Sequence, residues 1–239
     1  MKNVLLLSAI MVAFFSCEEE LHLTFSEVNS LIEEGAVVEI NMPIANGEGV
    51  ASKSINSTLD NHIANILNFS EDQSASLTMD EAIAIFQKAY SDFKIEMDEN
   101  SIPWEATFDG DLIYQSSEII CIAVNAYTNT GGAHGNMNIT LFNFNAQSGK
   151  PLELKDLVND EDEFTKIVES HFKKEIQGED EASMKDYFFG EGFHLPANIG
   201  FNDDGVLILY NVYEIASYAN GITEFTIPFE DLISVLNSY

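Results

Sequence analysis

The chain has 239 residues, of which 40 are acidic and only 10 are basic, so its formal net charge is −30. Nucleic acids and anionic membranes need basic surfaces, and this charge therefore argues against both as partners. It favours attraction of basic partners, although acidity also serves solubility alone. With 46% hydrophobic residues, the chain is long enough for one large core or two closely packed ones.

The first 17 residues have the pattern of a lipoprotein signal peptide. Lys2 precedes an apolar run from Val4 to Phe15, which has the length of a signal core and is too short to span a bilayer. The Ser16-Cys17 pair that follows predicts Cys17 as the lipid-modified first mature residue, and an ordinary signal peptide with an incidental cysteine is the alternative. We expect residues 18–35 to form a tether, with the exported protein lipid-anchored to the cell envelope, on the periplasmic face or the outer surface.

The first half of the mature chain combines strand and helix patterns. Residues 36–42 carry apolar side chains on one face, as in a strand. Apolar residues recur at helical spacing over 55–67, and a capping box at 78–81 opens a second helix. From 104 to 144 the period changes to two, which predicts an antiparallel meander with one buried face. Cys121 lies in that region, and we expect it to be buried as a small apolar residue.

The second half shows a turn at 147–151 and a helix over 160–177. An Asp-Gly hairpin turn at 202–205 is followed by alternation over 206–210. A closing strand at 225–227 leads into a short terminal helix. The whole pattern indicates an α+β fold of antiparallel β-meanders with packed helices, arranged as two intimate subdomains.

A glycine-rich phrase, Thr-Gly-Gly-Ala-His-Gly-Asn, occupies residues 130–136. It lies between two strand patterns, so it predicts a shaped hairpin loop and not a phosphate loop, which needs a following helix. We expect structural roles, through positive φ or close backbone approach, for four glycines of this and the next phrase: Gly131, Gly132, Gly135 and Gly221. His134 is either a ligand contact or general base, or a structural histidine bonded to the backbone.

A second phrase, Tyr-Asn-Val-Tyr-Glu-Ile-Ala-Ser-Tyr-Ala-Asn-Gly, occupies residues 210–221. Tyr213, Glu214 and Tyr218 are its candidate ligand-binding residues, and an exposed strand acid is the alternative for Glu214. The histidines do not have zinc-site spacing, and the acidic runs do not have the calcium-loop pattern. We therefore expect no metal and no cofactor.

The two phrases, in this order, resemble a bacterial cell-envelope family. It includes the ectodomain of the lysozyme-sensing anti-sigma factor RsiV and the non-catalytic N-terminal domain of the peptidoglycan deacetylase PdaC. Residues 36–147 resemble the module that RsiV and PdaC share, and residues 148–239 resemble the C-terminal RsiV module. The segments that carry the likeness are 38–43, 127–136, 148–157, 210–221 and 227–229.

The resemblance implies a non-enzymatic binding domain of the cell envelope. Its partner would be a basic protein such as lysozyme, or peptidoglycan fragments, with His134, Tyr213, Glu214 and Tyr218 as contacts. The alternative is a peptidoglycan- or glycan-directed hydrolase or deacetylase-like enzyme. That alternative requires His134 and Glu214 in one cleft, within hydrogen-bond reach of each other.

Overall fold

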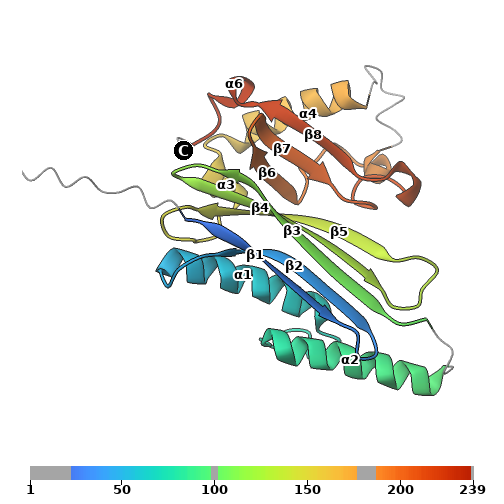
Figure 1. Cartoon of the computed structure of the whole chain (residues 1–239). Helices are drawn as coiled ribbons and strands as arrows, with labels where there is room; N and C mark the ends of the chain where they lie inside the picture. The colour runs from blue at the N-terminus through green and yellow to red at the C-terminus, as the bar shows by residue number, and fades with distance from the viewer. Residues whose placement is uncertain (1–22, 98–101, 177–186, 238–239) are drawn as a thin grey trace, which may run out of the picture.

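The chain folds into four stacked layers in the computed structural model, which describes residues 23–97, 102–176 and 187–237 (Figure 1). Helices α1 (Val50–Leu67) and α2 (Met79–Glu96) cover one face of a five-stranded sheet. A three-stranded sheet packs on the other face, and helix α4 (Glu161–Glu175) covers it from outside. The predicted α+β fold with antiparallel meanders is confirmed.

The five-stranded sheet has its strands in chain order, and their bounds are β1 (Phe25–Ile32), β2 (Val37–Ala45), β3 (Glu105–Gln115), β4 (Ile119–Asn129) and β5 (Asn136–Asn145). Strands β3 to β5 form the predicted antiparallel meander. Strands β2 and β3 pair in parallel, because α1 and α2 form the crossover between them. A bulge between Leu112 and Tyr114 shifts the register of β3 against β4.

Strand β1 corrects the prediction of a tether over residues 18–35, because residues 25–32 pair with β2 along their whole length. The strand lies at the sheet edge and most of its residues are exposed, including polar Ser26, Glu27 and Asn29. Sequence alternation marks a strand only where one face is buried, and β1 has no such face. The predicted signal peptide with Cys17, and residues 18–22, lie outside the described residues.

The larger core lies between this sheet and helices α1 and α2. Alternate residues of β4, such as Ile120, Ile122 and Val124, point into it and are fully buried. Ile55 and Phe86 meet them from the two helices. Helix α2 begins with the predicted capping box, in which the Thr78 hydroxyl and the Glu81 carboxylate each accept the other residue's backbone N–H.

The three-stranded sheet consists of β6 (Asn198–Asn202), β7 (Gly205–Tyr210) and β8 (Thr223–Pro228). Asp203 and Asp204 form the predicted hairpin turn between β6 and β7. Every residue of β7 is buried, because one face packs against the α4 side and the other against β5. This sheet is therefore an internal layer of the molecule.

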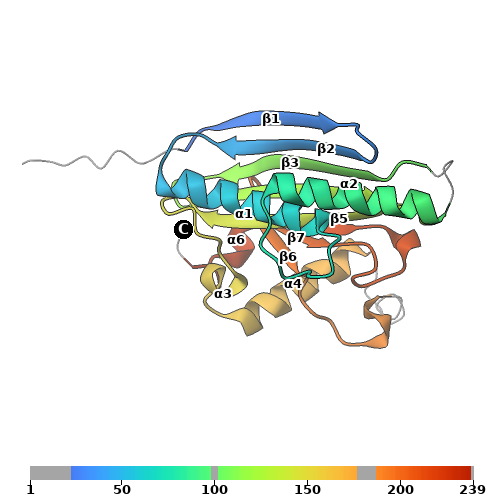
Figure 2. The ribbon, with the colours of Figure 1, turned by 90° about the horizontal axis from the view of Figure 1, so that it is seen from below.

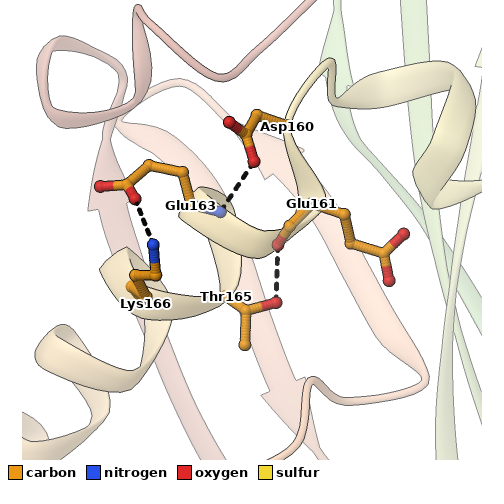
Figure 3. A network of polar contacts seen from close by, with 5 residues as sticks. All are labelled: Asp160, Glu161, Glu163, Thr165 and Lys166. Carbon is orange, nitrogen blue, oxygen red and sulfur yellow. Dashed lines mark hydrogen bonds and ion pairs between the residues drawn. The ribbon is translucent and has the colours of Figure 1, made fainter.

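Helix α4 begins at an acidic cap, as the sequence predicts (Figure 3). The Asp160 carboxylate accepts the backbone N–H of Glu163 at 3.0 Å, and the Lys166 ammonium donates to the Glu163 carboxylate at 2.8 Å. The remaining helices are short: α3 (Leu154–Leu157), η1 (Phe188–Gly190), η2 (Tyr218–Asn220) and the predicted terminal helix α6 (Phe229–Leu232). Over the described ranges, none of the helices has the length and apolar character that crossing a membrane requires.

Candidate ligand-binding face

The glycine-rich phrase and the second phrase meet in space, although about 80 residues separate them along the chain. The His134 ring stacks on the Tyr218 ring, with centroids 4.8 Å apart and planes 25° apart. The Tyr218 ring lies 5.6 Å from the Tyr213 ring. We call these three residues the aromatic cluster. Tyr213 is 54% exposed and Tyr218 is 46% exposed, so the cluster presents its rings to solvent.

The loop that carries His134 owes its shape to two of its three glycines. Gly131 has φ of +83°, which an L side chain adopts only with strain. A Cβ on Gly135 would lie 2.3 Å from the Tyr127 ring, so the close approach there requires glycine. Gly132 has neither a positive φ nor a close neighbour, and the prediction of a structural role is wrong for that residue.

His134 is held by the backbone of Gly135 as well as by the stack. Its Nδ1 lies 2.8 Å from the Gly135 carbonyl oxygen. Only an N–H donates to a carbonyl oxygen, so this contact places a proton on Nδ1. The imidazole is thus oriented as a flat surface beside Tyr218, which suits a contact residue.

Glu214 holds the second phrase in place. One carboxylate oxygen accepts the backbone N–H of Ala197 and the other accepts that of Asn211, each at 2.8 Å. Among the described residues, no hydrogen bond or ion pair joins Glu214 to His134, so the dyad that the enzyme alternative requires is not formed. Burial, followed by the charge of Glu214, raises the pKa of Tyr210, whose hydroxyl donates to the His194 carbonyl at 2.8 Å.

Strained backbone occurs at Tyr213 of the cluster and at two residues of η1. In the described residues, positive φ outside glycine occurs at Phe188 (59°), Phe189 (52°) and Tyr213 (66°). The two segments are joined by a hydrogen bond from the Phe188 N–H to the Ile215 carbonyl at 2.6 Å. Such strain persists only where packing enforces it, and it concentrates at functional sites. The sequence did not predict Phe188 or Phe189, because no local signal marks a positive φ at phenylalanine.

Three asparagine side chains join the two halves of the molecule beside the cluster: Asn143, Asn198 and Asn211. We call them the asparagine seam. Asn211 donates to the Ile139 carbonyl and accepts the Ile139 N–H, both at 2.8 Å. Asn198 accepts the Leu141 N–H at 3.0 Å, and Asn143 donates to the Ile199 carbonyl at 2.7 Å. The seam thus pairs the outer edge of β5, which no neighbouring strand covers.

An open groove of about 520 Å³ runs along this seam. Asn138 and Thr140 of β5 form one side, and Tyr213 and Glu214 lie on the other. Carboxamide and hydroxyl side chains line part of the groove, which connects the seam with the exposed ring of Tyr213. Its side chains offer hydrogen bonds and aromatic contact but no nucleophile paired with a base.

The described residues give this face neither a group of metal-ligating side chains nor a reactive thiol. Within the described ranges, no three His, Cys, Asp or Glu side chains are grouped as metal ligands. Cys121 is buried on β4, as predicted, and burial raises the pKa of its thiol to about 12. A thiol that stays protonated at neutral pH is a poor nucleophile.

Comparison with known proteins finds a family likeness in each half of the chain. Residues 30–137 match the family described as deacetylase PdaC, and residues 155–230 match DUF3298, a family of unknown function. The crystal structure of a DUF3298 family protein from Bacteroides fragilis NCTC 9343 superposes with a TM-score of 0.68 at 18% identity, over 90% of this chain and 94% of that chain. The crystal structure of a DUF3298 family protein from Pseudomonas aeruginosa PAO1 superposes with a TM-score of 0.64 at 19% identity. That superposition covers 91% of this chain and 96% of that chain. A search of curated proteins found no significant match.

Proposed function

Because this chain pairs a PdaC-like segment with a DUF3298 segment, as its resemblance to the RsiV and PdaC family predicts, we propose that it is an extracytoplasmic binding protein of the cell envelope. Its ligand is a basic protein such as lysozyme, bound at the aromatic cluster. The observation that carries the proposal is the convergence of the two phrases into the exposed stack of His134, Tyr218 and Tyr213.

The physical case combines charge with aromatic anchors. A chain with net charge −30 attracts basic partners over roughly the Debye length, about 8 Å at physiological ionic strength. Such attraction raises the association rate more than it slows dissociation. Exposed tyrosines then supply large contact area at low cost in side-chain entropy, and aromatic anchors dominate many interfaces.

Binding fits this face better than hydrolysis does. A general acid or base must exchange a proton with the substrate, but both oxygens of the Glu214 carboxylate hold backbone N–H groups. The groove is lined by Glu214 but not by His134. Glu214 is therefore a positioning residue for Tyr213 in this proposal.

The test is surface-plasmon binding of a purified lysozyme at low and high salt. We expect the association rate to fall as salt rises, and Tyr218→Ala to raise the dissociation rate about tenfold, the effect of losing one interface anchor. Leu31→Ala is the control, since Leu31 is 57% exposed and lies on β1, at the edge of the sheet opposite β5. A salt-independent association rate, or equal effects of both variants, would contradict the proposal.

The seam groove favours wall glycan as a second candidate, because carboxamides and hydroxyls beside a tyrosine ring suit a sugar. Peptidoglycan fragments should then bind with a loss of affinity in Tyr213→Ala, and lysozyme should not bind at any salt. The same fragments test the enzyme alternative. Release of products by the wild type, lost in both His134→Ala and Glu214→Gln, would replace binding by hydrolysis.

We also propose that Cys17 carries the lipid that anchors the protein to the envelope. The support is the signal-peptide pattern that ends at this residue. Labelled fatty acid should enter the wild-type protein and not Cys17→Ser. Equal labelling of both proteins would show that the anchor is elsewhere.

A further inference from the structure

A second groove, of about 370 Å³, lies on the helix-covered side of the five-stranded sheet. Strands β1 and β2 form one wall, and helices α1 and α2 form the other. Figure 2 shows that the helices run beneath the middle of the sheet, while β1 and β2 extend beyond them. The groove shares no residue with the aromatic cluster or the asparagine seam.

The groove side of β1 and β2 carries mainly apolar side chains. Val28 of β1 and Ile40 and Ile44 of β2 line the groove, and Val28 is 44% exposed. Their sequence neighbours Asn29 and Asn41 are polar and alternate to the opposite face. An open strand wall of this kind normally carries polar side chains, so the exposed apolar strip favours an apolar occupant.

The floor of the groove is built and fixed. Leu59 and Ile63 of α1 are buried at its base, at 3% and 1% exposure. The Asn56 side chain clamps the end of β2, since it accepts the Ala45 N–H at 2.9 Å and donates to the Ala45 carbonyl at 3.0 Å. The walls are thereby held in register without an occupant.

Two carboxylates, Asp60 of α1 and Asp80 of α2, complete the lining. No other titratable side chain lines the groove from β1, β2, α1 or α2. Within the described residues, neither carboxylate makes a hydrogen bond or an ion pair. Burial raises the pKa of Asp60, because partial desolvation disfavours the charged carboxylate. A cation beside Asp60 would stabilise the ionised form of its carboxylate.

We propose that this groove binds a small amphipathic cation, an aliphatic chain that ends in a single ammonium group. The apolar walls take the chain, and Asp60 and Asp80 take the ammonium. The volume lies in the range of small-molecule sites, about 300–1000 Å³. Aliphatic anions are repelled by the same two carboxylates and by the net charge of −30.

Octylammonium and octanoate form a matched pair of probes for the full-length protein, since they share the chain and differ in the sign of the charge. We expect octylammonium to bind in calorimetry and to shift the NMR methyl signals of Met79 and Ile83, which line the groove. Its affinity should rise with pH through the titration of Asp60. Octanoate should bind at least tenfold more weakly.

Variants separate the local carboxylate from the overall charge. Asp60→Asn should weaken octylammonium about fivefold, the upper end for a solvent-accessible ion pair. Asp92→Asn is the matched control, because it removes the same charge from α2 outside the groove and should leave the affinity unchanged. Ser30→Phe fills the groove from the exposed strand β1 and should abolish binding while the far-ultraviolet circular dichroism stays unchanged. Equal binding of both probes, equal effects of the two aspartate variants, or no binding of octylammonium would overturn the proposal.

Discussion

Helices α1 and α2 cover one face of the five-stranded sheet, and the three-stranded sheet covers only β3, β4 and β5 on its other face. The three-stranded sheet is itself buried on both faces. In β4 the residues facing the helices are aliphatic and form a broad core with α1 and α2. In the C-terminal half, Phe172 of α4 contacts a set of aromatic rings that close a smaller core: Tyr187, Phe188, Phe193, Tyr210 and Phe225. The three-stranded sheet, called the narrow sheet below, therefore lies between the five-stranded or wide sheet and α4.

This difference makes the smaller half depend on the larger one. Leu207 and Leu209 of β7 pack on Leu141 of β5, so one face of the narrow sheet has no core without the wide sheet. The asparagine seam adds polar pairing along the same contact. We therefore expect the two subdomains to unfold as one cooperative unit.

The largest predicted effect tests that unit at the seam. Asn211→Ala should lower the free energy of unfolding by about 2–4 kcal/mol, because it leaves the N–H and the carbonyl of Ile139 without partners. Trp104, the only tryptophan, lies in the N-terminal core, so its fluorescence reports the other half. Fluorescence and circular dichroism should shift together in urea.

Asn138→Ala is the control, since Asn138 lies next to Ile139 on β5, is exposed, and makes a single long hydrogen bond of 3.4 Å with Thr140. Its effect should stay within about 0.5 kcal/mol. If Asn211→Ala left the urea midpoint of the Trp104 fluorescence transition unchanged, the two halves would unfold separately.

The second prediction concerns the contact between β4 and β6, which should make the free energy of unfolding depend on pH. The Cys121 sulfur accepts the Phe201 N–H at 3.4 Å, and burial raises the thiol pKa from 9.0 to about 12. The folded state therefore keeps its proton while the unfolded state releases it, so this stability is complete below pH 9 and is lost as pH rises toward 12. We expect a loss of about 1 kcal/mol between pH 8 and pH 10. Cys121→Ala should flatten that part of the profile in urea titrations, and an unchanged slope would contradict the assignment.

A third prediction concerns the loop that brings the halves together at the aromatic cluster. Gly131→Ala should lower the free energy of unfolding by about 1–2 kcal/mol, because φ of +83° strains an L residue. Gly132→Ala should stay within about 0.5 kcal/mol, since its Cβ would meet only the His134 carbonyl at an ordinary 3.6 Å. Thermal melts of Gly131→Ala and Gly132→Ala measure the two losses of stability. Equal losses would show that the positive φ of Gly131 is not the cause.

The sequence predicts the locally determined elements of both halves but not the contacts between the halves. Helices α1 and α2, the meander and the β6–β7 hairpin follow from periodicity, caps and turn residues, which are local signals. Strand β1 was missed because an exposed edge strand has no alternation. The asparagine seam was missed because a carboxamide that replaces a strand partner is indistinguishable in sequence from a surface asparagine. The meeting of His134 with Tyr218 depends on long-range packing, which no local pattern in the sequence indicates.

The smallest effects test the outer layer, where α4 covers the narrow sheet (Figure 3). Asp160→Ala removes the side-chain acceptor for the Glu163 N–H and should cost about 1 kcal/mol, the usual value for a helix N-cap. Lys166→Met breaks only the ion pair with Glu163, whose side chains are 69% and 50% exposed, and should cost about 0.5 kcal/mol or less. High salt should erase the Lys166 effect and leave most of the Asp160 effect, because a cap hydrogen bond is shorter-ranged than a screened charge pair. Urea melts of both variants at two salt concentrations measure this. If salt erased both effects equally, the acids would act through charge alone, and the C-terminal half would be held by its aromatic core without help from the helix cap.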